Sequence, residues 1–127
     1  MQEIRTEHLT VGYEKKPLIG DVNLSVRPGE ILTLIGPNGS GKSTILKTIT
    51  KQLKKLDGTV FLGENSMDEL KDSQISKRLS MVMTERLRTE LMSGREVVAS
   101  GRYPYTGRFG ILSKEDWVKV DEAIALV

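Results

Sequence analysis

One eight-residue stretch, at residues 36–43, constrains the fold of this chain more than any other part of the sequence. It matches G-x-x-x-x-G-K-[ST] at every fixed position, with a short apolar run before it and apolar residues at helical spacing after it. Its members are Gly36, Pro37, Asn38, Gly39, Ser40, Gly41, Lys42 and Ser43. A chance glycine-rich turn would not bring both flanks with it, so the pattern predicts a phosphate-binding loop between a strand and a helix.

Each residue type in this loop has a chemical reason to be there. Glycines at 36, 39 and 41 permit backbone conformations that other residues avoid, so successive N–H groups can converge on phosphate oxygens. Lys42 can reach the β and γ phosphates, and the Ser43 hydroxyl can coordinate Mg²⁺. The start of the following helix adds positive partial charge. The sequence therefore predicts a nucleotide site that also takes Mg²⁺.

The segments around the loop indicate an α/β fold that opens with antiparallel strands. Apolar and polar residues near alternate spacing predict half-buried strands at residues 4–11 and 22–26. The nearly continuous apolar run at residues 31–35 predicts a strand buried on both faces of a parallel sheet. Apolar residues at helical spacing predict an amphipathic helix over residues 43–56.

Shorter elements follow this helix in the sequence. Strands are predicted at residues 59–62 and 80–83. Between them, Asp72 or Ser73 is predicted to cap a short helix that reaches toward Arg78, because these side chains can accept a hydrogen bond from the first N–H groups of a helix.

The last part of the chain is predicted to be helical. Helices are expected at residues 94–100 and 113–127, and Ser113 followed by Asp116 fits a capping pattern at the start of the second. That helix carries apolar residues on one face, which we interpret as core: Trp117, Val120, Ile124 and Val127.

The domain organisation follows from this change of character. Residues 1–92 are assigned to an antiparallel β part with a phosphate-loop core, and residues 93–127 to the start of a helical subdomain. The last helix runs to the final residue without a stop signal, so we expect a truncated chain.

The composition narrows the functions that are open to the chain. With 127 residues, 38% of them apolar, the chain is long enough for a domain with a hydrophobic core. Cysteine is absent, which excludes disulfides, thiolate metal sites and catalysis by a thiol. A net charge of +2 is too small to predict a nucleic-acid partner, and no apolar run approaches the roughly 18 residues of a membrane span.

Beyond the loop, motifs along the whole chain resemble the ATPase subunit of ABC transporters. Residues 36–44, preceded by Arg-Pro-Gly-Glu at 27–30, are similar to this family, and residues 94–98, 101–105 and 112–116 resemble its branch that imports ferric siderophores, haem and cobalamin. The resemblance implies a P-loop NTPase (RecA-like) core with an N-terminal antiparallel β subdomain and the start of an α-helical subdomain.

The resemblance also implies roles for single residues. Tyr13 falls where the family places an aromatic that stacks on adenine, and Thr44 completes the nucleotide-binding stretch. The family usually has a glutamine that contacts Mg²⁺ and the attacking water; a gap-free count places Thr84 there, with Glu85 next to it. The candidate catalytic residues are thus Lys42, Thr84 and Glu85, with Ser43 and Thr84 as candidate Mg²⁺ ligands.

As a whole, the resemblance implies an ATPase that couples ATP binding and hydrolysis to import of an iron complex or cobalamin. It implies a homodimer on the cytoplasmic face of the membrane, bound to permease subunits and serving a substrate-binding protein indirectly. It also implies a chain about twice as long, with a signature motif, a catalytic carboxylate and a switch histidine that this sequence does not contain. The 127 residues alone are therefore expected to be nearly inactive.

Three alternatives remain open. A GTPase or small-molecule kinase would be another P-loop enzyme, but N-K-x-D and D-x-x-G stretches are absent and about 35 residues precede the loop. An ABC-type ATPase without a transporter, acting on DNA or ribosomes, would call for a more basic surface. The third alternative is a module that binds nucleotide without turnover.

Overall fold

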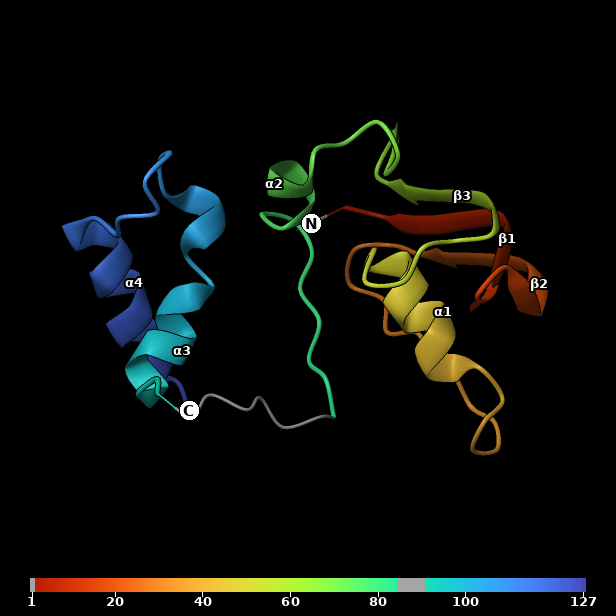
Figure 1. Cartoon of the computed structure of the whole chain (residues 1–127), viewed down its shortest axis with the longest axis horizontal. Coiled ribbons are helices and arrows are strands. Elements are labelled where there is room, and N and C mark those ends of the chain that lie inside the picture. Colours follow the sequence, from red (N-terminus) through yellow and green to blue (C-terminus); the bar gives the residue numbers. More distant parts are fainter. Residues whose placement is uncertain (1, 85–90) are drawn as a thin grey trace. The chain divides into compact units, whose positions relative to one another are not determined.

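The computed structural model describes residues 2–84 and 91–127, and the chain divides into two compact units. One unit runs to Met81 and the other begins at Val82 (Figure 1). The boundary between residues 92 and 93 was placed at the start of the helical motif, and it stays a prediction. Within the described ranges, no helix combines the length and the apolar character needed to cross a membrane.

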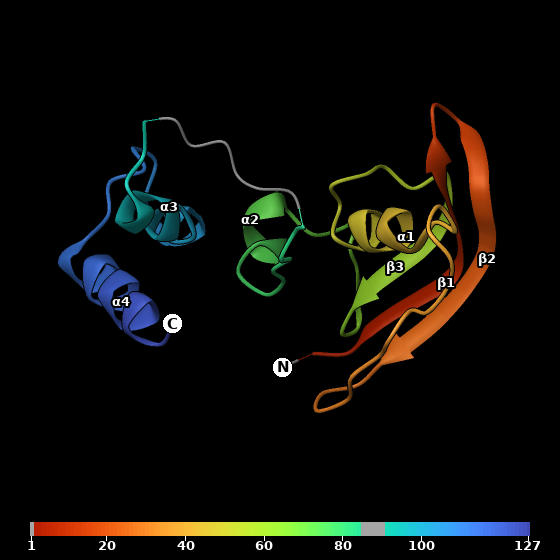
Figure 2. The same ribbon diagram turned by 90° about the horizontal axis from the view of Figure 1, so that it is seen from below.

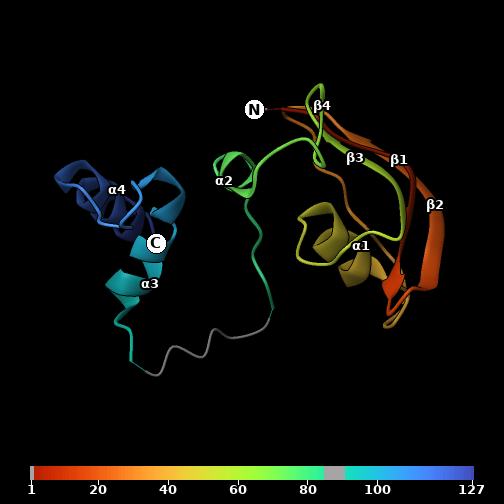
Figure 3. The same cartoon turned by 45° about the horizontal axis from the view of Figure 1, so that its top comes forward.

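The first unit is built on an antiparallel sheet. Its strands are β1 (Ile4–Tyr13), β2 (Lys16–Val26), β3 (Asp57–Leu62) and β4 (Asn65–Ser66), in the spatial order β2-β1-β3-β4 (Figure 3). The predicted antiparallel opening is confirmed, and so is the strand predicted at residues 59–62.

The turn between β1 and β2 is tight and fixes how β1 ends. Glu14 and Lys15 have φ of 49° and 65°, and two successive positive values are the signature of a type I′ hairpin turn. Tyr13 and Lys16 form the last pair of the hairpin, and a Cβ on Gly12 would collide with the Lys16 carbonyl. The close approach of the two strands at Gly12 therefore sets the register in which Tyr13 leaves the sheet.

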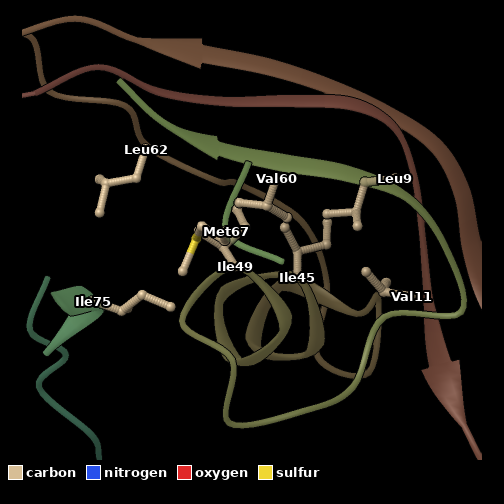
Figure 4. Packing of buried hydrophobic residues seen from close by; sticks show 8 residues of the cluster. All are labelled: Leu9, Val11, Ile45, Ile49, Val60, Leu62, Met67 and Ile75. Carbon is tan, nitrogen blue, oxygen red and sulfur yellow. The ribbon is translucent and has the colours of Figure 1, made fainter. Parts of the chain in front are cut away.

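The helix α1 (Lys42–Ile49) packs against one face of this sheet (Figure 2). Ile45 and Ile49 lie four residues apart on the helix and both enter the core. Figure 4 shows the buried cluster that results, with side chains from α1, β1, β3 and the segment after β4. Its members are Leu9, Val11, Ile45, Ile49, Val60, Leu62, Met67 and Ile75.

The predicted extent of this helix was wrong. It was expected to reach residue 56 but ends at Ile49, and Lys51 adopts a left-handed φ of 60° that helices of L-residues do not continue through. The Leu56 N–H already donates to the Thr10 carbonyl at 2.9 Å. The chain thus returns to the sheet edge within the span that apolar spacing assigned to the helix.

Two predicted strands, at residues 31–35 and 80–83, are not formed. Ile31 and Ile35 are 94% and 91% exposed, and Val82 is 97% exposed. Strands of a parallel sheet depend on hydrogen bonds to neighbouring strands, and within the described residues neither segment has a ladder partner. The parallel sheet that these two segments need is not formed among residues 2–84 and 91–127.

A short helix, α2 (Asp72–Ile75), follows β4. The predicted helix is present, but the predicted caps were wrong, because Asp72 lies inside the helix and Lys71 precedes it. The Gln74 side chain accepts a hydrogen bond from the Lys71 N–H at 2.9 Å. Ile75 anchors the helix in the core of the first unit.

The second unit contains α3 (Gly94–Ser100), a 3-10 turn (Tyr103–Tyr105) and α4 (Lys114–Ala125). Both helices were predicted, but α4 ends at Ala125 and does not run to the final residue. The capping pattern is confirmed: the Asp116 carboxylate accepts from the Ser113 N–H at 2.9 Å while the Ser113 hydroxyl accepts from the Asp116 N–H. The apolar stripe is only partly core. Val120 is buried, whereas Ile124 and Val127 are exposed.

Asp116 also joins α4 to the end of α3. The Arg102 guanidinium donates two hydrogen bonds to it, at 2.8 and 2.9 Å, and stacks over the Tyr105 ring. The pKa of the Asp116 carboxyl lies below its ordinary value, chiefly because the Ser113 N–H donates to it and secondly because Arg102 does. The charged form of Asp116 therefore stabilises this unit.

This arrangement makes the second unit sensitive to acid. Because the folded pKa of Asp116 is lowered, its contribution is present above the unfolded pKa of about 3.9 and is lost as pH falls through the folded value. We expect Asp116→Asn to lower the stability of α3 and α4 near neutral pH and to flatten its loss in acid, measured by hydrogen exchange of the helix amides at several pH values. Glu115→Gln, an exposed neighbour, is the control; equal behaviour of the two variants would contradict the role of Asp116.

Candidate nucleotide-binding site

The predicted phosphate loop connects the irregular segment at residues 31–35 to α1. Gly39 and Gly41 have φ of 81° and 89°, in the left-handed region that favours glycine. Gly41 is buried, and a Cβ there would collide with the Ile19 side chain of β2. The loop therefore depends on glycine at this point both for its backbone turn and for its close contact with the sheet.

Lys42 folds back over the loop. Its Nζ donates to the carbonyls of Gly36 and Pro37, each at 2.6 Å, and lies 3.3 Å from the Ser40 hydroxyl. An ammonium group is thus held directly at the loop by backbone oxygens. An incoming phosphate oxygen, which carries more negative charge than a carbonyl, can replace these partners.

The N-terminal end of α1 faces the same loop. The first hydrogen bond of the helix runs from the Ile45 N–H to the Gly41 carbonyl at 2.9 Å, so the N–H groups before Ile45 have no partner within the helix. The first turn, which the structure describes in full, contains no acidic residue. The positive end of the helix dipole is therefore uncompensated, which favours an anion such as phosphate.

Ser43 and Thr44 occupy the first turn of α1 in different surroundings. Ser43 is exposed, so its hydroxyl is available as the hard oxygen ligand that Mg²⁺ prefers. Thr44 is only 5% exposed, and its hydroxyl lies 3.3 Å from the hydroxyl of Tyr13. The donor set at the loop is compatible with Mg²⁺ held between Ser43 and phosphate oxygens.

The structure brings Tyr13 to this site although it lies far away in the sequence. The end of β1 carries its side chain to the first turn of α1, where its hydroxyl meets Thr44. Half of its surface, 50%, stays accessible. A half-exposed aromatic ring beside a phosphate loop is suited to stack on a nucleotide base.

Two residues that support the loop escaped the sequence analysis. The Leu18 and Ile19 side chains of β2 lie directly against Gly41. The predicted strand covered only residues 22–26, whereas β2 begins at Lys16, so the sequence analysis did not place these two residues in the sheet.

The structure does not test the two remaining candidates. Thr84 belongs to the second unit, and Glu85 lies outside the described residues. Among residues 2–84 and 91–127, no group of three or more His, Cys, Asp or Glu residues could hold a metal ion. The roles of Thr84 and Glu85 in catalysis, and of Thr84 as a Mg²⁺ ligand, stay predictions.

A cavity of about 750 Å³ lies elsewhere in the first unit. Its lining includes Thr48, Thr50, Met67 and Ile75, so it adjoins the C-terminal end of α1. The lining contains none of residues 36–44, all of which the structure describes. The cavity is therefore a separate feature from the candidate nucleotide site.

Comparison with known proteins places these features in a family context. The sequence model of the ABC transporter family matches residues 19–127. An uncharacterised ABC transporter ATP-binding protein of Methanocaldococcus jannaschii is 45% identical over 113 residues, which is 89% of this chain and 39% of that protein. The iron(3+)-hydroxamate import ATP-binding protein of Bacillus subtilis is 35% identical over 116 residues, 91% of this chain and 43% of the relative.

The fold has counterparts among solved structures. A nucleotide-free ATP-binding cassette from an ABC transporter matches 99% of this chain and 53% of its own chain, with a TM-score of 0.72 and 24% sequence identity. This likeness supports the fold. The chain spans less than half of the length of the two curated relatives described above.

Proposed function

Because the chain belongs to the ABC transporter family, we propose that residues 36–44 and Tyr13 bind ATP with Mg²⁺ as the N-terminal part of an importer's ATPase. The observation that carries this proposal is the Lys42 ammonium, held at the loop beside an acid-free helix N-terminus. The names of the relatives, which are ATP-binding proteins, support the choice of ATP over other nucleotides.

The chain's own residues would bind and orient the nucleotide. Lys42 would leave the carbonyls of Gly36 and Pro37 and pair with the β and γ phosphates, while loop N–H groups cover the remaining oxygens. Ser43 would hold Mg²⁺, which when bound neutralises charge on the phosphates. Tyr13 would hold the adenine. Phosphoryl transfer to water needs little more than positioned phosphates, a metal and an oriented water, so this chain supplies binding and positioning.

Thr84 or Glu85 is proposed to hold a Mg²⁺-bound water, since either offers an oxygen ligand. In the whole transporter, at least one of the variants Thr84→Val and Glu85→Ala is expected to lower turnover about tenfold or more, because orienting the attacking water contributes at least that much in related chemistry. Steady-state ATPase assays on the assembled transporter measure this. Glu64→Ala, in an exposed turn, is the matched control. Unchanged turnover and Mg-ATP affinity in both variants would remove these residues from the mechanism.

The proposed cargo is an iron complex such as a ferric siderophore or haem, with cobalamin as the second candidate. Support comes from the similarity to a protein named for iron(3+)-hydroxamate import, and from the motifs at residues 94–98 and 101–105. The proposed partners are permease subunits in the membrane and a second copy of this ATPase, with a substrate-binding protein acting through the permease. The proposed location is the cytoplasmic face of the membrane.

A growth experiment tests the cargo. A strain that lacks the whole gene should fail to grow when a ferric siderophore is the sole iron source, yet should grow on a soluble iron salt. The intact gene should restore growth, and the same gene carrying Lys42→Ala should not. If the strain without the gene grows normally on the ferric siderophore but no longer grows when it depends on added cobalamin, the proposed cargo becomes cobalamin. Normal growth under both conditions would contradict the proposed cargo.

A further inference from the structure

The hydroxyl of Thr44 is the starting point, because a buried hydroxyl needs a partner. Thr44 is 5% exposed, and no described buried side-chain nitrogen or oxygen lacks a hydrogen-bond partner. The partner that the structure gives the Thr44 Oγ1 is the Tyr13 hydroxyl, at 3.3 Å. The two residues lie on different elements and are 31 positions apart.

The position of Tyr13 is determined by the hairpin and not by the helix. Tyr13 follows the fully buried Val11 and the tightly packed Gly12, and it precedes the left-handed pair Glu14 and Lys15. Its hydroxyl therefore approaches α1 from a rigid support. This is the condition under which one side chain can position another.

Thr44 occupies a sensitive place in the loop–helix junction. It follows Ser43 directly, and its carbonyl accepts a hydrogen bond from the Thr48 hydroxyl at 2.8 Å. A hydroxyl has one proton to donate and two lone pairs to accept with. If Tyr13 donates to the Thr44 Oγ1, the Thr44 proton stays free to point at a phosphate oxygen.

From this geometry we propose that the Tyr13 hydroxyl is a positioning group for the phosphates: it donates to Thr44 and thereby directs the Thr44 hydroxyl toward the bound phosphate chain. Without that donor, the Thr44 hydroxyl is free to rotate toward another acceptor. Tyr13 then contributes to phosphate binding separately from any stacking on adenine. The inference rests on the proposed ATP site and adds a second role for a residue of that site.

The test separates the ring of Tyr13 from its hydroxyl by using a ligand without a base. Affinities of the full chain for Mg-ATP and for inorganic triphosphate with Mg²⁺ are measured by calorimetry. Tyr13→Phe keeps the ring, and we expect it to lower the affinity for both ligands about three- to tenfold, which is the effect of losing one neutral hydrogen bond. Tyr103→Phe, in the second unit, is the matched control and should bind both ligands as the unchanged chain does.

Substitutions at Thr44 complete the cycle. Thr44→Val should weaken the binding of both ligands, and Thr44→Ser should bind them more tightly than Thr44→Val because it retains the hydroxyl. The Tyr13→Phe/Thr44→Val double variant should bind no more weakly than Thr44→Val alone. Thermal unfolding of each variant shows whether it is folded. If Thr44→Val does not fold, the conservative Thr44→Ser and Tyr13→Phe variants still provide the test.

The outcomes distinguish this inference from the proposed function. If the unchanged chain binds both ligands, Lys42→Ala weakens binding about tenfold or more and Tyr13→Phe binds inorganic triphosphate normally, the positioning role is wrong and the ATP site stands. Additive losses in the double variant would likewise overturn the positioning role. If the unchanged chain binds neither ligand, the ATP site itself fails and the inference falls with it.

Discussion

Replacing Lys42 with alanine is expected to reduce Mg-ATP binding about tenfold to a hundredfold, the effect of losing a hydrogen bond between charged groups. In the structure the Lys42 ammonium is bonded to two carbonyls of the loop, at 2.6 Å each. It can exchange these for phosphate oxygens with little movement, whereas alanine leaves the phosphate charge without its cation. Calorimetric titration of Mg-ATP measures the loss directly.

Lys54→Ala is the control for this result, since it removes the same charge from an exposed position beyond the end of α1. It should bind Mg-ATP as tightly as the unchanged chain at moderate ionic strength. Equal affinities for Lys42→Ala and the unchanged chain would show that phosphates do not bind at the loop. Equal losses in both variants would show only a general effect of net charge.

The second large effect is expected in the sheet, at Gly58. Its φ is 81°, and a Cβ there would collide with the His8 carbonyl and lie 2.6 Å from the Leu9 Cα. Both contacts are backbone atoms of β1, so no side chain can move aside. Gly58→Ala should therefore lower the free energy of unfolding by about 1–2 kcal/mol because of the left-handed backbone and by about 1–3 kcal/mol because of overpacking. Urea unfolding followed by circular dichroism, with hydrogen exchange of β3 amides, measures the loss.

Gly29→Ala isolates the backbone part of this effect. Gly29 has a similar φ of 86°, but a Cβ there would meet nothing within 4 Å. The Gly29→Ala variant should therefore lower the free energy of unfolding by only about 1–2 kcal/mol. If the two variants lost the same stability, the close approach of β1 and β3 at Gly58 would contribute nothing.

The phosphate loop could be predicted residue by residue because its chemistry is local. Its glycines, Lys42 and Ser43 follow one another at fixed spacing, and the backbone conformations they need depend on their nearest neighbours. The caps of the last helix are local in the same way, and the pairing of Ser113 with Asp116 is confirmed. The family resemblance built on these motifs is confirmed as well.

Elements that depend on distant partners were predicted less well. An apolar run such as residues 31–35 indicates what a strand would bury, but the strand exists only where a neighbour supplies the ladder. The helix after the loop ended early because Leu56 pairs with Thr10 of β1, a contact that periodicity does not encode. The contact between Tyr13 and Thr44 could not be predicted either, because it depends on where the hairpin ends relative to α1.

Titration of Mg-ATP and Mg-GTP into this chain, with phosphate release followed in parallel, tests the central claim most directly. The proposed part of an ABC ATPase should bind Mg-ATP in preference to Mg-GTP and release almost no phosphate, since the carboxylate and signature motif that the family uses are not among these 127 residues. A preference for GTP, or robust turnover that Lys42→Ala abolishes, would instead identify a self-sufficient P-loop enzyme and contradict the account.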